Sequence, residues 1–200
     1  MTSGRKKAFD ETVALEAAMD VFWKKGYIGA SLADLTQAMG INKPSLYSTF
    51  GNKEALFIKA TQHYIDNKIQ VNLGLLSEEN VPLKSRLKNY MLSVMSIQCE
   101  SDQPKGCYLV LCQSELVGGD IPDEAASLLT ELESAPKAML THLFATDDEA
   151  IALGLSENAS SNALSLYTVL KGTASMARGG ASSEALEPVV DNMLKGIGLH

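Results

Sequence analysis

Helix caps and helix stops follow one another closely between residues 31 and 53, and this spacing constrains the fold more than any other feature. Residues 31–34, Ser-Leu-Ala-Asp, have the pattern of a capping box, in which the serine and the acid each satisfy a free backbone N–H at a helix start. Gly40 suits the left-handed residue that ends a helix, and Asn42 caps a new helix with Pro44 in its first turn, where a missing N–H costs nothing. Residues 51–52, Gly-Asn, repeat the stop and the cap. The sequence therefore predicts two short helices joined by a tight turn.

The rest of the chain also has the pattern of helices. Apolar residues recur with a period near 3.6, whereas the alternating apolar runs and Asn-Gly turns typical of strands are absent. A first helix is expected from the N-cap Asp10 to Gly26, and a longer helix from Lys53, with Leu76 as its furthest end. Further helices are expected at residues 82–98, 107–117, 123–144, 157–178 and 183–195. The predicted fold class is all-α.

Length and charge indicate two unequal domains. The net charge of the 200 residues is −7. Residues 1–60 hold eight Lys and Arg against six Asp and Glu, whereas residues 61–200 hold nine against eighteen. The segment with the two short helices is thus the only part that is not acidic. Its excess of positive charge is small, so the case for DNA binding depends on where each basic residue lies. We expect a helix-turn-helix domain at residues 1–60 and a larger helical domain at residues 61–200.

Two short helices across a tight turn form a helix-turn-helix, whose second helix presents its exposed side to the major groove of DNA. Leu46 and Phe50 form the apolar side of this second helix. The other side chains can bond base edges or phosphates, and lysines can neutralise the phosphates that flank the groove. The candidate DNA-binding residues are Arg5, Ser31, Lys43, Pro44, Ser45, Tyr47, Ser48, Thr49 and Lys53. A packing module of three helices has the same pattern, so a helical adaptor that does not bind DNA is an alternative.

Several other classes of protein are disfavoured. No apolar run reaches the ~18 residues that a membrane span needs, and the first residues lack the apolar segment of a signal peptide, so we expect a cytoplasmic location without membrane contact. Neither a nucleophile motif nor a phosphate loop is found, so no catalytic residues and no cofactor are expected. His63, His142 and His200 are scattered, which argues against a metal site.

The three cysteines, at positions 99, 107 and 112, do not form the pattern of a disulfide framework or a zinc site. Cys107 follows a Pro-Lys-Gly break and is expected in the first turn of a helix, where the helix dipole and Lys105 would favour the reactive thiolate. A thiol-based redox or electrophile sensor that uses Cys107 is therefore a second alternative. Reduced, buried and inert cysteines are the simpler interpretation.

The helix-turn-helix region closely resembles the TetR family of transcriptional regulators. Its most specific part is the run Leu-Tyr-x-x-Phe-x-x-Lys-x-x-Leu at residues 46–56, and the resemblance extends over residues 4–62. Beyond residue 62 it is weaker, with residues 106–109 and 164–179 similar to the C-terminal domain of some members. The resemblance implies that Tyr47 and Lys53 contact phosphates, that Ser45, Ser48 and Thr49 face bases, and that Arg5 reaches the minor groove or the backbone. Many relatives have larger polar residues where Ser48 and Thr49 stand, which implies modest base readout and a larger part for DNA shape.

The resemblance also implies a homodimer that binds a near-palindromic operator and acts as a repressor released by a small-molecule effector. A C-terminal domain would enclose the effector and dimerise through its last two helices. Candidate pocket residues are Met91, Met95, Cys99, Cys107, Tyr108 and Leu111, although such stripes are often plain core. Candidate dimer residues are Leu164, Tyr167, Leu170 and Ala174, although a helix buried within one chain needs similar residues.

Overall fold

Three helices form an N-terminal head. The computed structural model describes residues 9–100 and 102–200. In it the head consists of α1 (Glu11–Gly29), α2 (Leu32–Ala38) and α3 (Lys43–Phe50). The expected caps are present: Ser31 and Asp34 form the reciprocal capping box of α2, and the Asn42 side chain accepts from the backbone N–H of Ser45. The two predicted short helices and their tight turn are therefore confirmed.

The remaining helices form the body. Helix α4 (Lys53–Tyr64) continues through the π-helical segment η1 (Ile65–Ile69) and the 3₁₀ segment η2 (Gln70–Ser77). It is followed by α5 (Leu83–Cys99), α6 (Tyr108–Ser114), η3 (Glu115–Gly118) and α7 (Asp123–Thr146). The chain ends with α8 (Asp148–Ala152), η4 (Leu155–Asn158), α9 (Ala159–Arg178) and α10 (Ser183–Gly196). Strands are absent from the part of the chain that the structure describes, so the all-α prediction is confirmed.

The helix boundaries differ from the predicted ones where local capping decides them. Helix α1 does not end at Gly26 but is interrupted there, with φ 73° and ψ −177°, and resumes to Gly29. The short helix α8 was not predicted. It exists because the Asp147 carboxylate accepts from the backbone N–H groups of Glu149 and Ala150 and so caps a new helix directly after α7.

One hydrophobic core joins the head to the body. Phe22 and Trp23 of α1 pack edge-to-face on Phe57 and Tyr64 of α4, with ring centroids 5.1 Å and 5.0 Å apart. Tyr108 of α6 stacks on Tyr64 at 5.0 Å, and its hydroxyl lies 2.8 Å from Thr61 Oγ1. The packing therefore continues across residue 60, where the sequence changes character.

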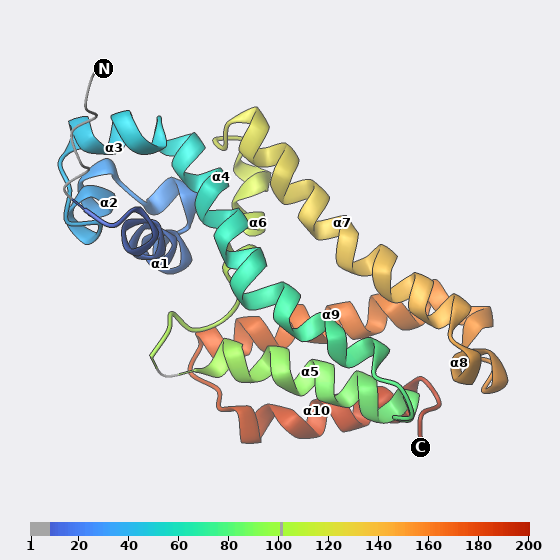
Figure 1. Cartoon of the computed structure of the whole chain (residues 1–200). Helices are drawn as coiled ribbons and strands as arrows, with labels where there is room; N and C mark the ends of the chain where they lie inside the picture. The colour runs from blue at the N-terminus through green and yellow to red at the C-terminus, as the bar shows by residue number, and fades with distance from the viewer. Residues whose placement is uncertain (1–8, 101) are drawn as a thin grey trace.

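A second core lies within the body. Helices α5, α9 and α10 pack side by side, and the long α7 runs from the head to the far end of the body, where it contacts α9 (Figure 1). Leu87, Met91, Phe144, Leu166 and Leu194 are buried where these helices meet. Within the described residues, no helix combines the length and the apolar character required to cross a membrane.

Candidate nucleic-acid interface and internal pocket

Helix α3 has one buried side and one exposed side. Leu46 and Phe50 are 0% and 4% exposed, and they anchor the helix in the head. The opposite side leaves Tyr47 49% exposed. Its neighbours on the accessible surface are Lys43, Pro44, Ser45, Ser48 and Thr49, of which Ser45 and Thr49 are half-buried. These candidate residues therefore share one accessible face at the edge of the molecule furthest from α9 and α10 (Figure 1).

The chemistry of this face suits a polar polyanion. Lys43 supplies a positive charge, and Tyr47 supplies a hydroxyl that has no hydrogen bond to any other described residue. The hydroxyl of Ser48 donates to the carbonyl of Ser45 at 3.1 Å, so its lone pairs remain available to a donor on a base edge rather than to a phosphate. Caps at Ser31, Asn42 and Asn52 begin three helices in this region. Exposed helix starts and a cation are the groups that proteins place against phosphates.

Lys53, at the first position of α4, is held in place rather than extended into solvent. Its Nζ lies 4.4 Å from the centroid of the Tyr27 ring, a cation–π contact. Burial lowers the pKa of Lys53, and the nearby Glu115 carboxylate acts in the opposite direction. The ammonium therefore starts from a fixed position beside α3. Arg5, the remaining candidate, lies outside the described residues.

The head is attached to the body through Glu115. Because α1 is interrupted at Gly26, the N–H groups of Tyr27 and Ile28 lack acceptors in the preceding turn. The Glu115 carboxylate in η3 accepts from both, at 2.7 Å from Tyr27 N and 3.2 Å from Ile28 N. A side chain at position 26 would overlap this carboxylate. The segment that follows α6 thus caps the second part of α1.

Two more hydrogen bonds join α1 to the body, both at Trp23. Its Nε1 donates to the carbonyl of Gly106 at 3.2 Å, and its own carbonyl accepts from Arg178 Nη2 at 3.2 Å. Gly106 directly precedes Cys107, and Arg178 ends α9. Segments before and after α6 therefore both contact the head.

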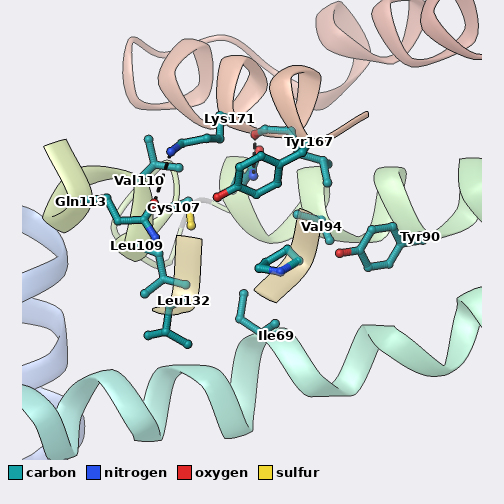
Figure 2. Close-up of a pocket in the computed structure, with 13 residues that line it drawn as sticks. Ile69, Tyr90, Val94, Cys107, Leu109, Val110, Gln113, Leu132, Tyr167 and Lys171 are labelled. Carbon is teal, nitrogen blue, oxygen red and sulfur yellow. Dashed lines mark hydrogen bonds between the residues drawn. The ribbon is translucent and has the colours of Figure 1, made fainter. Parts of the chain in front are cut away.

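An apolar pocket of about 90 Å³ lies on the other side of α6, between η1, α5, α7 and α9 (Figure 2). A shallower cavity of about 250 Å³ adjoins it along α7 and shares five of its wall residues. The pocket is lined by Ile69, Tyr90, Val94, Gln98, Cys107, Leu109, Val110, Gln113, Leu132, Pro136, Tyr167, Leu170 and Lys171. Most of this wall is hydrocarbon, which is typical of ligand pockets.

Of the six candidate pocket residues, Cys107 alone borders this pocket. Met91 and Met95 are 0% and 1% exposed inside the second core, because α5 turns this side toward the other body helices. Tyr108 belongs to the core shared with the head, and Leu111 is half-buried outside the pocket. Cys99 lines a separate polar hollow beside the start of α10, where burial raises the pKa of its thiol. Tyr90 and Tyr167, which do line the pocket, were not predicted as pocket residues.

The four candidate dimer residues lie on different sides of α9. Leu164 is 55% exposed, but Leu170 and Ala174 are 8% and 1% exposed, because they pack inside the chain. Tyr167 faces the pocket. The side of α9 that is free on this chain contains Leu164, Thr168, Gly172, Ser175 and Met176.

Comparisons with known proteins agree with this architecture. A sequence model described as "Bacterial regulatory proteins, tetR family" matches residues 14–60. The solved structure of the TetR family transcriptional regulator CifR, a cysteine mutant in complex with 26-bp double-strand operator DNA, superposes with a TM-score of 0.77. The two sequences are 31% identical, and the match covers 96% of this chain and 98% of CifR. The chain belongs to the TetR family.

Curated TetR relatives match to different extents. The repressor ComR of Escherichia coli is 38% identical over 107 residues, which are 54% of this chain and 51% of ComR. The chain therefore spans about half the length of this relative. YezE of Bacillus subtilis, an uncharacterized HTH-type transcriptional regulator, is 28% identical over 88% of this chain and 93% of its own length.

Proposed function

We propose that this TetR-family protein is a sequence-specific DNA-binding repressor that binds a near-palindromic operator as a homodimer and releases it when a small-molecule effector binds. The observation that carries the proposal is the accessible face of α3, bounded by capped helix starts and by Lys53, in a head of TetR architecture. CifR, one similar protein of known structure, was solved with operator DNA.

Dimerisation is supported by apolar side chains that α9 and α10 leave without cover. Leu164 and Met176 of α9 are 55% and 58% exposed, and Val189 of α10 is 43% exposed. Small residues between them, Thr168, Gly172 and Ser175, leave room for the close approach of a second copy. Two heads of such a dimer would read major grooves about one helical turn, roughly 34 Å, apart.

Effector release is supported by the position of α6. Its inner side lines the pocket, and the segments at its two ends contact α1 at Trp23 and Tyr27. A ligand that fits one position of α6 better than another would shift the population of head orientations.

The test is selection of tight binders from a random duplex library by the reduced, purified protein at near-physiological salt, which suppresses sequence-independent binding. We expect one near-palindromic sequence to be enriched. If no sequence is enriched, and Tyr47→Ala lowers the stability of the protein without any effect on DNA binding, the helical adaptor is favoured and the proposal is overturned.

A second candidate function, thiol-based sensing, is favoured by the location of Cys107. Its sulfur lies in the pocket wall, 3.5 Å from the hydroxyl of Tyr64, and its neighbour Gly106 bonds to Trp23 of the head. Cys112 is fully buried, and burial raises the pKa of its thiol strongly.

This candidate predicts that a thiol-alkylating agent releases operator DNA from the wild type and from Cys112→Ser but not from Cys107→Ser. The measurement is a gel shift with the enriched operator, after mass spectrometry has located the adduct. Equal release from the Cys107→Ser protein would reject sensing by Cys107 and leave non-covalent effector binding as the remaining proposal.

A further inference from the structure

Most polar groups in the pocket wall are already satisfied by the protein. The Gln98 side chain donates to the Leu170 carbonyl at 3.3 Å and accepts from the Thr173 hydroxyl at 3.0 Å. Gln113 donates to the Leu129 carbonyl and accepts from Lys171 Nζ, both at 3.3 Å. Lys171, the cation of this wall, also lies 3.5 Å from the Glu133 carboxylate. The pocket therefore offers no free positive charge to an anionic ligand, and a buried anion without a partner is costly.

Tyr90 is one of two exceptions among these groups. The residue is 6% exposed, and its hydroxyl has no hydrogen-bond partner among the described residues. Every side-chain nitrogen or oxygen of the described residues that is fully enclosed does have a partner. The Tyr90 hydroxyl is therefore not sealed in the core but opens onto the pocket that Tyr90 lines, and Figure 2 shows it directed toward the enclosed space.

Tyr167 approaches the same space from α9. Its hydroxyl also lacks a hydrogen bond within the described part of the chain and is directed into the pocket on the Cys107 side (Figure 2). Burial raises the pKa of Tyr90 to about 12, and burial together with Glu133 raises the pKa of Tyr167 to about 12. Both phenols thus stay protonated at neutral pH and remain able to donate.

From this geometry we infer the chemical class of the effector: a small, uncharged, mostly apolar molecule with an acceptor oxygen such as a ketone carbonyl, which takes a hydrogen bond from Tyr90. The inference deepens the proposed function and rests on it for the word effector. The apolar wall, with Ile69, Val94 and Leu132, receives the hydrocarbon part. A volume of about 90 Å³, extended by the adjoining cavity of about 250 Å³, places the site at the small end of the range of ligand pockets.

The test compares three probes of one shape: acetophenone, α-methylstyrene, which replaces the carbonyl oxygen with CH₂, and benzoate, which is charged. Binding to the reduced full-length protein without DNA is measured by isothermal titration calorimetry. We expect Tyr90→Phe to weaken acetophenone binding about three- to tenfold, as loss of one hydrogen bond does, and to leave α-methylstyrene binding unchanged. Tyr108→Phe, which removes a buried hydroxyl that faces Thr61 instead, is the matched control and should alter neither.

Three results would overturn the inference: no acetophenone binding up to its solubility limit, equal effects of Tyr90→Phe on the ketone and the alkene, or tighter binding of benzoate than of acetophenone. Tyr90→Phe removes a hydroxyl that bonds to no other described residue, so the melting temperature of the protein should not fall. If the protein enriches no operator but binds the ketone in a way that depends on Tyr90, the inference about the ligand stands and the proposed repressor function is rejected. An enriched operator without ketone binding would do the reverse.

Discussion

At the scale of single residues, Lys53 and Ser45 are expected to contribute to DNA binding in different ways. Lys53 is a fixed cation over the Tyr27 ring, whereas Ser45 is a half-buried hydroxyl residue on the accessible face of α3. Lys53→Ala should weaken binding of all duplexes alike and reduce the slope of log affinity against log salt by about one. Ser45→Ala should change the preference at particular base pairs. Fluorescence anisotropy over a salt series with operator and scrambled duplexes separates the two effects.

Equal loss on operator and scrambled DNA for both variants would contradict this assignment of roles. Lys195→Ala is the control for charge, because Lys195 is exposed near the end of α10, far from α3 in the fold. Its affinity for either duplex should match that of the wild type.

The candidate residues of the head could be predicted because their positions depend on local chemistry. Ser31 and Asn42 cap helices through hydrogen bonds to residues three positions ahead, so the sequence alone contains the necessary information. The pocket residues depend on long-range packing instead. Tyr90 and Val94 share one side of α5, and Met91 and Met95 lie one position further along. The spacing of these residues does not tell which side of α5 faces the pocket and which side faces the core.

At the scale of helices, the interruption of α1 is expected to respond to substitution through Glu115. Gly26→Ala adds a Cβ that overlaps the Glu115 carboxylate and forces an alanine to φ 73°. We expect it to lower the free energy of unfolding by about 2–4 kcal/mol, from a backbone conformation (φ 73°, ψ −177°) that essentially only glycine adopts and from the lost hydrogen bonds. Urea denaturation provides the measurement.

Gly40→Ala is the matched control for this prediction. Gly40 has φ 64°, but a Cβ there would meet nothing within 4 Å, so only the backbone cost of about 1 kcal/mol should remain. If both substitutions cost the same, Glu115 has no part in the effect. In the Glu115→Ala background the overlap is absent, so Gly26→Ala should cost less there than it does in the wild-type background.

The junction between α7 and α8 should make stability depend on pH. Asp147 caps α8 and lies 2.7 Å from Arg86 Nη2, with side chains 14% and 11% exposed. Burial acts to raise the pKa of Asp147, but the hydrogen bond from Arg86 and the cap outweigh it and lower the pKa overall. The stabilisation is therefore fully present above the ordinary carboxyl value of about 3.9 and is lost as the pH falls below it.

Asp147→Ala tests this directly. Removal of one partner of a buried pair should lower the free energy of unfolding at pH 7 by about 2–4 kcal/mol. The difference from the wild type should shrink as the pH is lowered from 5 toward 3. A difference that stays constant over that range would show that the charge of Asp147 does not contribute.

At the scale of the whole molecule, we expect the exposed side of α9 to decide the oligomeric state. Leu164 is 55% exposed on the single chain, so Leu164→Glu should leave the fold intact while it places a charge in the expected dimer interface. Sedimentation velocity should show a dimer for the wild type and a monomer for the variant, which should also lose tight binding to the full operator.

Val117→Glu is the control for this change of surface. Val117 is 94% exposed in η3, away from α9 and α10, and should leave the dimer unaffected. A Leu164→Glu protein that sediments as a dimer would refute the interface. The sequence predicts α9 as an interface helix, which stays a prediction, but it did not identify the exposed side of α9, because Leu170 and Ala174 have the size and polarity of interface residues and are buried within the chain.

The aromatic core shared by head and body limits how this protein can be recombined. Tyr108 of the body packs in one core with Trp23, Phe57 and Tyr64. Helix α1 also donates hydrogen bonds to the Gly106 carbonyl and to the Glu115 carboxylate. A chimera that joins residues 9–77 to the body of another regulator would leave these rings and two backbone N–H groups facing surfaces of the wrong shape. A transplant of operator specificity therefore has to exchange the accessible residues of α3 alone, and leave the rest of the head on the body with which it packs.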